Sequence, residues 1–333
     1  MKKNQLITGI LVLSSLVACK KNVAPTSAIE EPVVAVENTP KTYAEISIKE
    51  GGHWEGREYL EGTFKNIDSL KVPTEHTDHS WFIRYEGPGW ESNKIGYRLY
   101  LDWRNAIDIF GKVTDTMVLS KVGQDGFDSY HEPQAWGSDI LKVGKGLGIG
   151  SIGRYVNKEI VHFKEVDSTF AKVENLENQS VVKVNYFGWK TNNQKTNLTS
   201  TLSISADERY TKHTIQNSEG LEGICTGIVK LNNLPLLQKE SDNKKWAYIA
   251  TYGEQTLIPD DLGMALFYEV ETVQSIFDGE HDHIIQFKPT KNAVSFYFLG
   301  AWEQEVNGIK TQEEFIIYLN DKLNELNASN KLK

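Results

Sequence analysis

Alternating apolar and polar positions dominate the chain from about residue 43 onward. In six segments β-branched or aromatic side chains recur at every second position, a period typical of strands with one buried face. These segments are residues 81–86, 95–100, 181–189, 198–205, 245–252 and 294–299. No cluster of Gly or Pro and no fixed repeat divides the body. The pattern predicts one mostly β domain over residues 43–333, folded as an antiparallel β-sandwich.

The period changes to a helical one near the end of the chain. Apolar side chains recur there at helical spacing, at Phe315, Leu319, Leu323 and Leu326. Thr311 and Glu314 have the spacing of a capping box, which satisfies backbone N–H groups at a helix start. We therefore expect a C-terminal amphipathic helix that packs on the back of a sheet.

The first residues have the order of a lipoprotein leader. Lys2 and Lys3 precede a largely apolar stretch over residues 6–17, which is too short to span a bilayer as a helix. Cys19 follows in the sequence Leu-Val-Ala-Cys, which has the form of a lipobox. We expect a signal peptide over residues 1–18, acylation of Cys19 and a flexible tether over residues 19–42. The protein would then be an outer-membrane lipoprotein, on the periplasmic face or the cell surface.

Cysteine content and charge narrow the possible functions. Cys19 and Cys225 are the two cysteines, so a disulfide within the processed chain and a zinc-type cysteine cluster are both excluded. Cys225 lies in an apolar run and is interpreted as a small buried hydrophobe. The net charge is −9, and losing Lys2 and Lys3 with the leader makes it −11. Such a charge argues against nucleic-acid binding, and no obligatory protein partner is predicted.

Five glycines lie within residues 144–153. The segment lacks the Gly-Lys-Ser/Thr ending and the following helix of a nucleotide-binding loop. We interpret it as a place where the backbone comes close to another chain segment or to a sugar.

A charged strand carries the first candidate chemistry. Alternation divides this segment between two faces, with Ile95, Tyr97 and Leu99 on one and Lys94, Gly96, Arg98 and Tyr100 on the other. The first face suits a core, whereas the second presents two cations beside an aromatic ring. Arg98 can hold the carboxylate of an acidic sugar through two hydrogen bonds. An internal salt bridge from Arg98 to Glu86 or Asp102 is an equally good interpretation.

A turn-rich stretch over residues 127–139 carries the second candidate chemistry. Tyr130 and His131 lie there among polar and aromatic side chains, in a loop on a rigid scaffold, where catalytic groups concentrate. Histidine exchanges protons near neutral pH, and tyrosine can donate one. Neighbours on a strand point oppositely, so both side chains serve one site only if the backbone bends. A hydrogen-bonded loop histidine without a catalytic role is the alternative.

Other groups are weaker candidates. Residues 281–283 (His-Asp-His) place two histidines on one side of a strand, but no third metal ligand is evident. His76, Asp78 and His79 have the same limitation, so no metal is predicted. Most tryptophans in such a chain belong to a core, and one or two are expected to stack on sugar rings. The tryptophans considered are Trp90, Trp103, Trp136, Trp189 and Trp302.

Several short segments occur in a specific order along nearly all of the body. The first reads Trp-Glu-Ser-Asn-Lys-Ile-Gly-Tyr-Arg over residues 90–98. The others are residues 107–110, 130–131, 136–139, 251–255, 260–263, 283–289 and 296–302. Together they resemble the ulvan dehydratase family, whose members tend to read W-E-N-x-R-I-A-F-R at the first segment. Asn93, Lys94 and Gly96 depart from that pattern, which puts the substrate detail in doubt.

The resemblance implies a dehydratase acting on oligosaccharides of ulvan, a sulfated polymer of rhamnose and uronic acids. Such an enzyme removes the C4 hydroxyl and the C5 hydrogen of the non-reducing-end uronate as water. It leaves a 4,5-unsaturated uronyl end. The resemblance also implies a β-supersandwich similar to that of galactose mutarotase.

The expected roles follow from this reaction. Removing the C5 proton creates an enolate beside the carboxylate, which Arg98 and Lys94 are expected to neutralise. His131 is the expected base and Tyr130 the expected acid, with the reverse assignment open. No metal or other cofactor is expected. The other substrate-binding candidates are Trp90, Trp136, Asp139 and His283.

Two other functions fit the same residues. A polysaccharide lyase would break a glycosidic bond by the same elimination and shorten the chain, whereas a dehydratase lowers the mass by one water. A non-catalytic glycan-binding lipoprotein would leave the sugar unchanged. The adjacent Tyr130 and His131 favour catalysis, because binding needs aromatic rings but no proton-transfer pair.

Overall fold

A computed structural model of the protein describes residues 40–124 and 129–333. The predicted signal peptide, Cys19 and nearly all of the predicted tether lie outside these residues. The first strand begins at Thr42, and the segment Pro40–Lys333 makes up one unit. Among the described helices, none combines the length and the apolar character that a membrane span requires.

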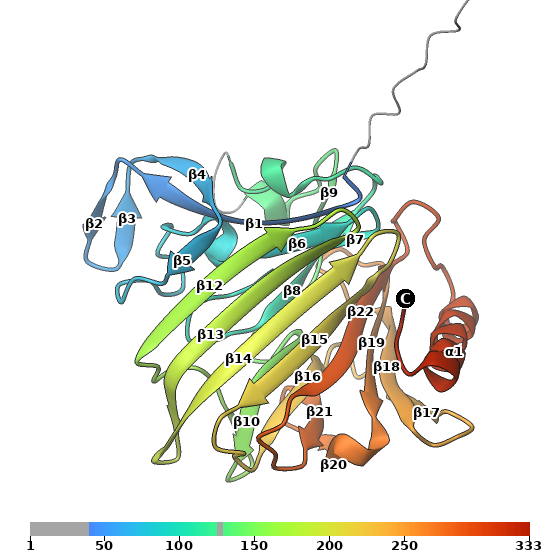
Figure 1. Cartoon of the computed structure of the whole chain (residues 1–333). Helices are drawn as coiled ribbons and strands as arrows, with labels where there is room; N and C mark the ends of the chain where they lie inside the picture. Colours follow the sequence, from blue (N-terminus) through green and yellow to red (C-terminus); the bar gives the residue numbers. More distant parts are fainter. Residues whose placement is uncertain (1–39, 125–128) are drawn as a thin grey trace, which may run out of the picture. The chain divides into compact units, whose positions relative to one another are not determined.

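The largest sheet in the described part has nine antiparallel strands (Figure 1). Alternate side chains of its longest strand are buried, as a period of two requires. The spatial order is β17 (Leu237–Glu240), β18 (Trp246–Glu254), β19 (Asp261–Glu269), β22 (Val294–Trp302), β15 (Tyr210–Asn217), β14 (Gln194–Ser205), β13 (Gln179–Thr191), β12 (Ser168–Asn175) and β5 (Ser69–Lys71).

Two further antiparallel sheets form a second layer against this one. The six-stranded sheet has the order β4 (Thr63–Ile67), β1 (Thr42–Glu50), β6 (Gly89–Ser92), β7 (Ile95–Leu99), β8 (Ile107–Lys112) and β9 (Gly137–Asp139). The five-stranded sheet has the order β11 (Glu159–Val161), β10 (Ile149–Val156), β16 (Ile224–Val229), β21 (Asp282–Phe287) and β20 (Val273–Asp278). A separate hairpin pairs β2 (His53–Glu55) with β3 (Glu58–Leu60).

The two sheets of the second layer meet between β8 and β10. A parallel bridge pairs Ile107 with Gly148, and the backbone N–H of Ile107 donates to Leu147 O at 3.1 Å. Gly148 has a φ of 74°, and a side chain there would collide with the carbonyl oxygen of Ile107. The prediction that the glycine-rich segment brings two backbones together is therefore confirmed.

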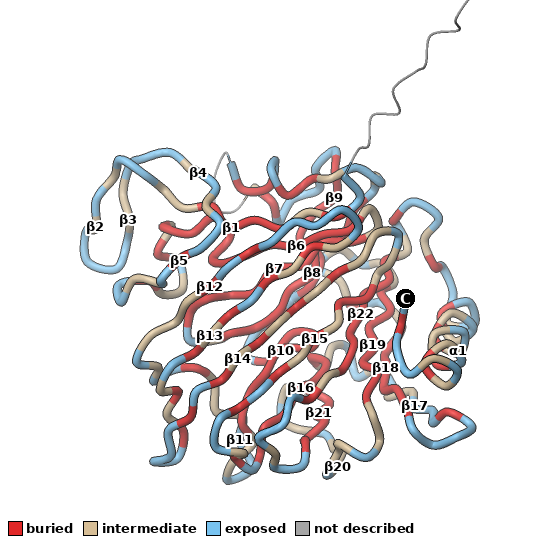
Figure 2. Tube along the Cα trace, in the orientation of Figure 1, coloured by how far each residue is buried: buried red, intermediate tan, exposed pale blue. Residues whose placement is uncertain are grey.

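The main core lies between the two layers. Figure 2 shows the buried trace running along β6, β7 and β8 and through the middle of the nine-stranded sheet. Ile95, Tyr97 and Leu99 all belong to this core, as the alternation predicts. Cys225 is a buried free thiol, also as predicted. The prediction of a mostly β, antiparallel sandwich is confirmed.

The predicted C-terminal helix is α1 (Gln312–Ser329). Thr311 is its N-cap and accepts a hydrogen bond from the backbone N–H of Glu314 at 3.1 Å. The Glu314 carboxylate in turn accepts one from the backbone N–H of Lys310 at 2.8 Å. The predicted apolar stripe packs on the side of the nine-stranded sheet away from the main core, where it meets Trp246 and Phe267.

One strand prediction is wrong. Residues 81–86 contain the 3-10 helix η1 (Arg84–Glu86) and a single bridge from Ile83 to Ile48. Trp81, Tyr85 and Glu86 have positive φ values, which a strand does not accommodate. Their alternating pattern arises because this segment buries charged side chains beside apolar ones.

The helix cap gives a test of the fold. We expect Thr311→Ala to lower the free energy of unfolding by about 1 kcal/mol, because the N–H of Glu314 loses its acceptor. Urea unfolding followed by circular dichroism measures this, with Thr311→Ser as the matched control that keeps the hydroxyl. Equal losses in both variants would contradict the capping role.

Candidate active site

The outer face of the six-stranded sheet, which points away from the core, is covered by buried charges. Three ion pairs lie over it, and each of their side chains is at most 3% exposed. Burying a pair of charges often stabilises a protein less than an apolar pair of the same size would. Three such pairs on one face therefore point to function. They are Glu45–Arg84, Glu91–Lys112 and Arg98–Asp108.

Arg98 is the centre of the largest cluster. It lies on β7 opposite Asp108 of β8, and its Nη2 is 2.7 Å from Oδ2 of Asp108 and 2.9 Å from Oδ2 of Asp139 on β9. Its Nη2 also donates to the hydroxyl of Tyr100 at 2.8 Å, and its Nη1 to that of Tyr130 at 2.7 Å. Strand order thus gathers one guanidinium, two carboxylates and two phenols in one place.

His131 joins this cluster through Asp139. Its Nδ1 lies 3.0 Å from Oδ2 of Asp139, while its side chain is 38% exposed. The hydrogen bond to Asp139 raises the pKa of His131 above its ordinary value. Because Nδ1 faces Asp139, Nε2 is the ring nitrogen directed away from the cluster. An exposed imidazole held by a buried carboxylate is a common arrangement for proton transfer.

Tyr130 lies next to His131 in the 3-10 helix η3 (Ser129–His131). This turn supplies the backbone bend that the two side chains need, and their ring centroids are 4.5 Å apart. Burial raises the pKa of Tyr130 well above its ordinary value, and the positive charge of Arg98 opposes that rise. Tyr130 is therefore protonated at neutral pH, beside a cation that would stabilise its phenolate.

A pocket of about 420 Å³ reaches this cluster at Tyr130. This volume is in the usual range for small-ligand sites. The aromatic rings of Trp81 and Tyr85 contribute to its lining, together with the cations Lys49 and Arg84. A lining that combines aromatic residues with cations suits a sugar acid.

Arg98 does not form the ion pair with Glu86 or Asp102 that the sequence offered as an alternative. Glu86 and Asp102 pair with Arg104 instead, with Nη2 of Arg104 at 2.8 Å from Oε2 of Glu86. The guanidinium carbons of Arg98 and Arg104 lie 4.6 Å and 4.2 Å from the ring centre of Tyr100. The two charge clusters therefore adjoin at this ring.

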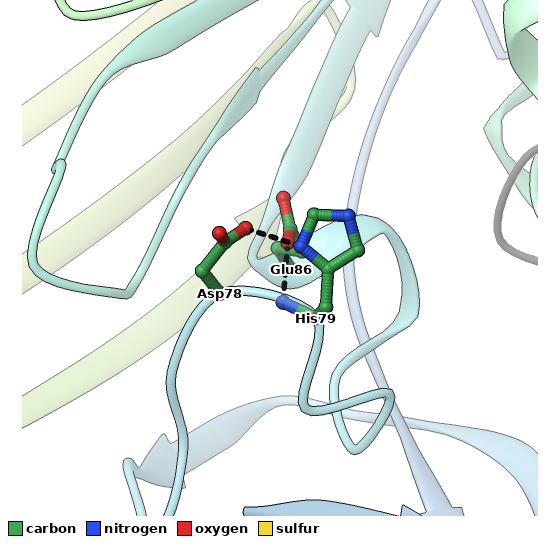
Figure 3. Close-up of side chains that lie close together, drawn as sticks. All are labelled: Asp78, His79 and Glu86. Atoms are coloured by element: carbon green, nitrogen blue, oxygen red, sulfur yellow. Dashed lines mark hydrogen bonds and ion pairs between the residues drawn. The ribbon is translucent and has the colours of Figure 1, made fainter.

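Asp78, His79 and Glu86 lie together at the edge of the second cluster (Figure 3), and their possible ligand atoms are within 4.8 Å of one another. Nδ1 of His79 is 2.7 Å from Oδ1 of Asp78. However, Nη2 of Arg104 lies 2.9 Å from the same oxygen and also contacts Glu86. A guanidinium already compensates both carboxylates, so these residues form an ion network and no catalytic step is assigned to a metal there.

Two predicted binding residues lie away from the cluster. Trp90 is fully buried, stacks on Tyr97 and donates from Nε1 to the Thr211 hydroxyl, so it is unable to stack on a sugar. The strand period turns it inward, opposite to Arg98. Lys94 precedes β7, and its charge acts on Asp207 and Glu305 rather than at Arg98.

Of the other three binding candidates, Asp139 is buried between Arg98 and His131. Trp136 and His283 differ in position. Trp136 is 8% exposed and packs edge-on against Phe110, which also contacts Tyr130 edge-on, so Trp136 reaches the cluster only through Phe110. His283 lies on the five-stranded sheet and bonds from Nδ1 to Asp278 at 2.6 Å. It lines a different pocket from the one at Tyr130.

Three residues of the site were missed in the sequence. Asp108 is a charged residue inside an otherwise apolar strand. That departure from the apolar pattern could have indicated a buried functional charge. Trp81 was assigned to a strand, although it borders the pocket. Lys49 gave no signal, because it joins the site only through the pairing of β1 with β4 and the bridge to Ile83.

Comparison with known proteins identifies a family without an activity. The family profile DUF4861, described as a domain of unknown function, matches residues 15–331. A search among curated proteins finds no match to the chain. The chemistry of the site is therefore the basis for a functional argument.

The cluster predicts a pH effect on stability. Burial and the charge of Asp139 raise the pKa of Asp108 from 3.8 to about 7. The folded protein then keeps a proton that the unfolded chain releases, so this contribution to stability is complete below pH 3.8 and is lost as the pH rises to 7. We expect Asp108→Asn to flatten the decline, measured by urea unfolding across that range. The exposed Asp242→Asn is the control, and parallel profiles for wild type and Asp108→Asn would contradict the assignment.

Proposed function

We propose that this chain, which belongs to the DUF4861 family, is a hydro-lyase acting on uronate-containing oligosaccharides of ulvan. It would remove the C4 hydroxyl and the C5 hydrogen of the non-reducing-end uronate. One observation carries the proposal: each proton-transfer candidate has a buried partner whose charge is opposite to the charge that the reaction would create on that candidate. His131 has Asp139, and Tyr130 has Arg98.

His131 is the proposed base. Its Nε2 takes the C5 proton, and the electron pair of that C–H bond becomes the new C4–C5 double bond. The imidazolium formed in this step is stabilised by the Asp139 carboxylate 3.0 Å from Nδ1. Asp139 is thus a positioning residue.

Tyr130 is the proposed acid. Its hydroxyl proton passes to the C4 oxygen, the C4–O bond breaks, and water leaves. The resulting phenolate is stabilised by Nη1 of Arg98, which already bonds the Tyr130 oxygen at 2.7 Å. Transfer of a proton from His131 through solvent to Tyr130 restores both groups, so no net acid or base is consumed.

The substrate carboxylate needs a separate cation. Arg98 is 3% exposed and already bonds two carboxylates and two phenols, so it acts on Tyr130 rather than on the substrate. Of the two cations lining the pocket, Arg84 is paired with Glu45. Lys49 is therefore the proposed carboxylate ligand, and Trp81 the proposed stacking ring.

The place of action is proposed from the leader. A signal peptide over residues 1–18 and acylation of Cys19 would put the protein in the outer membrane, where oligosaccharides from outside the cell arrive. The lipid and the sulfated rhamnose–uronate oligosaccharides are the proposed partners.

The proposed roles of His131 and Tyr130 predict how substitutions change activity. We expect His131→Ala and Tyr130→Phe each to lower formation of the unsaturated product about 10²-fold or more, because each removes a proton-transfer group. Ultraviolet absorbance of the product and a mass loss of one water measure this on saturated-end oligomers. The exposed His53→Ala, on the small hairpin, is the control. Shortened chains would show a lyase instead, and full activity in His131→Ala would refute the assigned base.

The contact between Asp139 and His131 predicts a shift in the pH dependence of activity. Replacing it with Asn removes the hydrogen bond that raises the pKa of His131. If His131 is the base, kcat/KM rises with pH through that pKa, and Asp139→Asn shifts this rise to lower pH. If kcat/KM instead falls as the pH rises, and Asp139→Asn shifts this fall to lower pH, His131 would be the acid and Tyr130 the base. An unmoved limb would show that the titrating group is not His131.

A further inference from the structure

Two adjoining pockets lie on the five-stranded sheet, away from the Tyr130 pocket. Their volumes are about 480 and 360 Å³, and they share Lys145, Glu280 and His281 in their linings. The larger is lined also by Lys142 and Lys230. The smaller is lined also by Trp103, Lys158 and Lys164.

The lysines of these pockets lack acidic partners. Within residues 40–124 and 129–333, none of the five has a carboxylate at ion-pair distance, whereas other lysines such as Lys190 and Lys195 do. Four acids also line the pockets, of which Asp278 pairs with His283 and Glu280 with His281. The other two are Glu159 and the buried Asp282. Five lysines, none of them at ion-pair distance from the four acids in the same linings, favour an anionic ligand in a protein whose net charge is −9.

An exposed tryptophan adds an apolar surface to the lysines. Trp103 is 38% exposed, and Nζ of Lys164 lies 5.2 Å from its ring centre. The ring of His162 meets it edge-on at 5.9 Å, which holds its orientation. A flat ring beside cations suits a ligand with both an apolar face and negative groups, as an acidic sugar has.

A buried carboxylate lies in the wall between these features. Asp282 is fully buried and lines the smaller pocket. Its Oδ1 accepts a hydrogen bond from the backbone N–H of Leu147 at 2.8 Å, but its Oδ2 has no hydrogen-bond donor among the described residues. An unsatisfied buried oxygen is costly, and burial raises the pKa of Asp282 to about 7, so the carboxyl group is able to carry a proton of its own near neutral pH. In either protonation state this oxygen is able to form a hydrogen bond with a sugar hydroxyl.

The pockets are close to the proposed active site along the chain. Lys142 follows Asp139 by three residues, so their Cα atoms are at most about 11 Å apart. Trp103 directly precedes Arg104 of the second charge cluster, and His162 bonds the carbonyl of Arg104 at 3.0 Å. The walls of these pockets and the two charge clusters are therefore built from neighbouring chain segments.

We propose that the two pockets form one groove that binds the anionic repeat units of an oligosaccharide behind its terminal uronate. The lysines would bind sulfate or carboxylate groups, and Trp103 would stack on a sugar ring. The identification of the ligand as a sugar rests on the proposed function, whereas its negative charge follows from the lysines alone.

The test uses lyase-generated ulvan oligomers, whose non-reducing end is already unsaturated, so that binding is measured without turnover. We expect Lys145→Gln with Lys164→Gln to weaken binding in calorimetry about tenfold or more, because two charge-assisted contacts are lost. The dependence of Kd on salt should become shallower. Lys71→Gln with Lys183→Gln, on the nine-stranded sheet, is the control of equal charge. Trp103→Ala should weaken the binding of sulfated and desulfated oligomers to the same extent.

Several outcomes would contradict the proposal that the two pockets form a binding groove. They are equal binding by the Lys145/Lys164 variant and its control, no binding by the unaltered protein, and equally tight binding of anionic phospholipid vesicles. The groove and the proposed function fail separately. Weakened binding in the variant without product from saturated-end oligomers would uphold the groove and refute the dehydratase. Product formation without groove-dependent binding would do the reverse.

Discussion

The burial of the Arg98 guanidinium on the outer face of a sheet is the constraint on which the rest of the site depends. A cation with a 3% exposed side chain requires polar partners within reach, and the carboxyl groups of Asp108 and Asp139 lie 2.7 Å and 2.9 Å from it on the next two strands. Asp139 in turn fixes the imidazole of His131, and Arg98 fixes the phenol of Tyr130. The proton-transfer pair therefore has its geometry set by one buried charge rather than by the loop that carries it.

This arrangement changes the part that an arginine plays in a site for sugar acids. A guanidinium exposed in a pocket would bind a carboxylate directly, but it would exert the same pull on every anion in solution. Arg98 instead bonds the hydroxyl of a phenol, so its charge would have the largest effect when that phenol loses a proton. In the proposed reaction, this effect would offset the cost of burying the charge.

The sequence revealed the fold more fully than the site. Period-two segments and the capping box located five strands and the helix, because these signals are local. The strand prediction for residues 81–86 was wrong because Arg84 and Glu86 bury their charges against Glu45 and Arg104. These partners lie outside the segment, so no local pattern reveals them. Asp108 and Asp139 meet at Arg98 only through the order β7, β8, β9, which no local pattern encodes. Strand alternation did place Arg98 on the face opposite to Ile95, Tyr97 and Leu99. The inward direction of Trp90 follows only from the pairing of β6 with β7, in which Trp90 lies opposite Tyr97.

The seam between the six- and five-stranded sheets joins the Arg98 cluster to the lysine-lined pockets. Ile107 at the seam precedes Asp108 directly, and Gly148 follows Leu147, whose N–H is held by Asp282. A displacement of one backbone across this single bridge therefore reaches the Arg98 cluster on one side and the lysine-lined wall on the other. Any side chain larger than hydrogen at position 148 would wedge the seam open, so this glycine governs the alignment of two sheets although it touches neither reacting group.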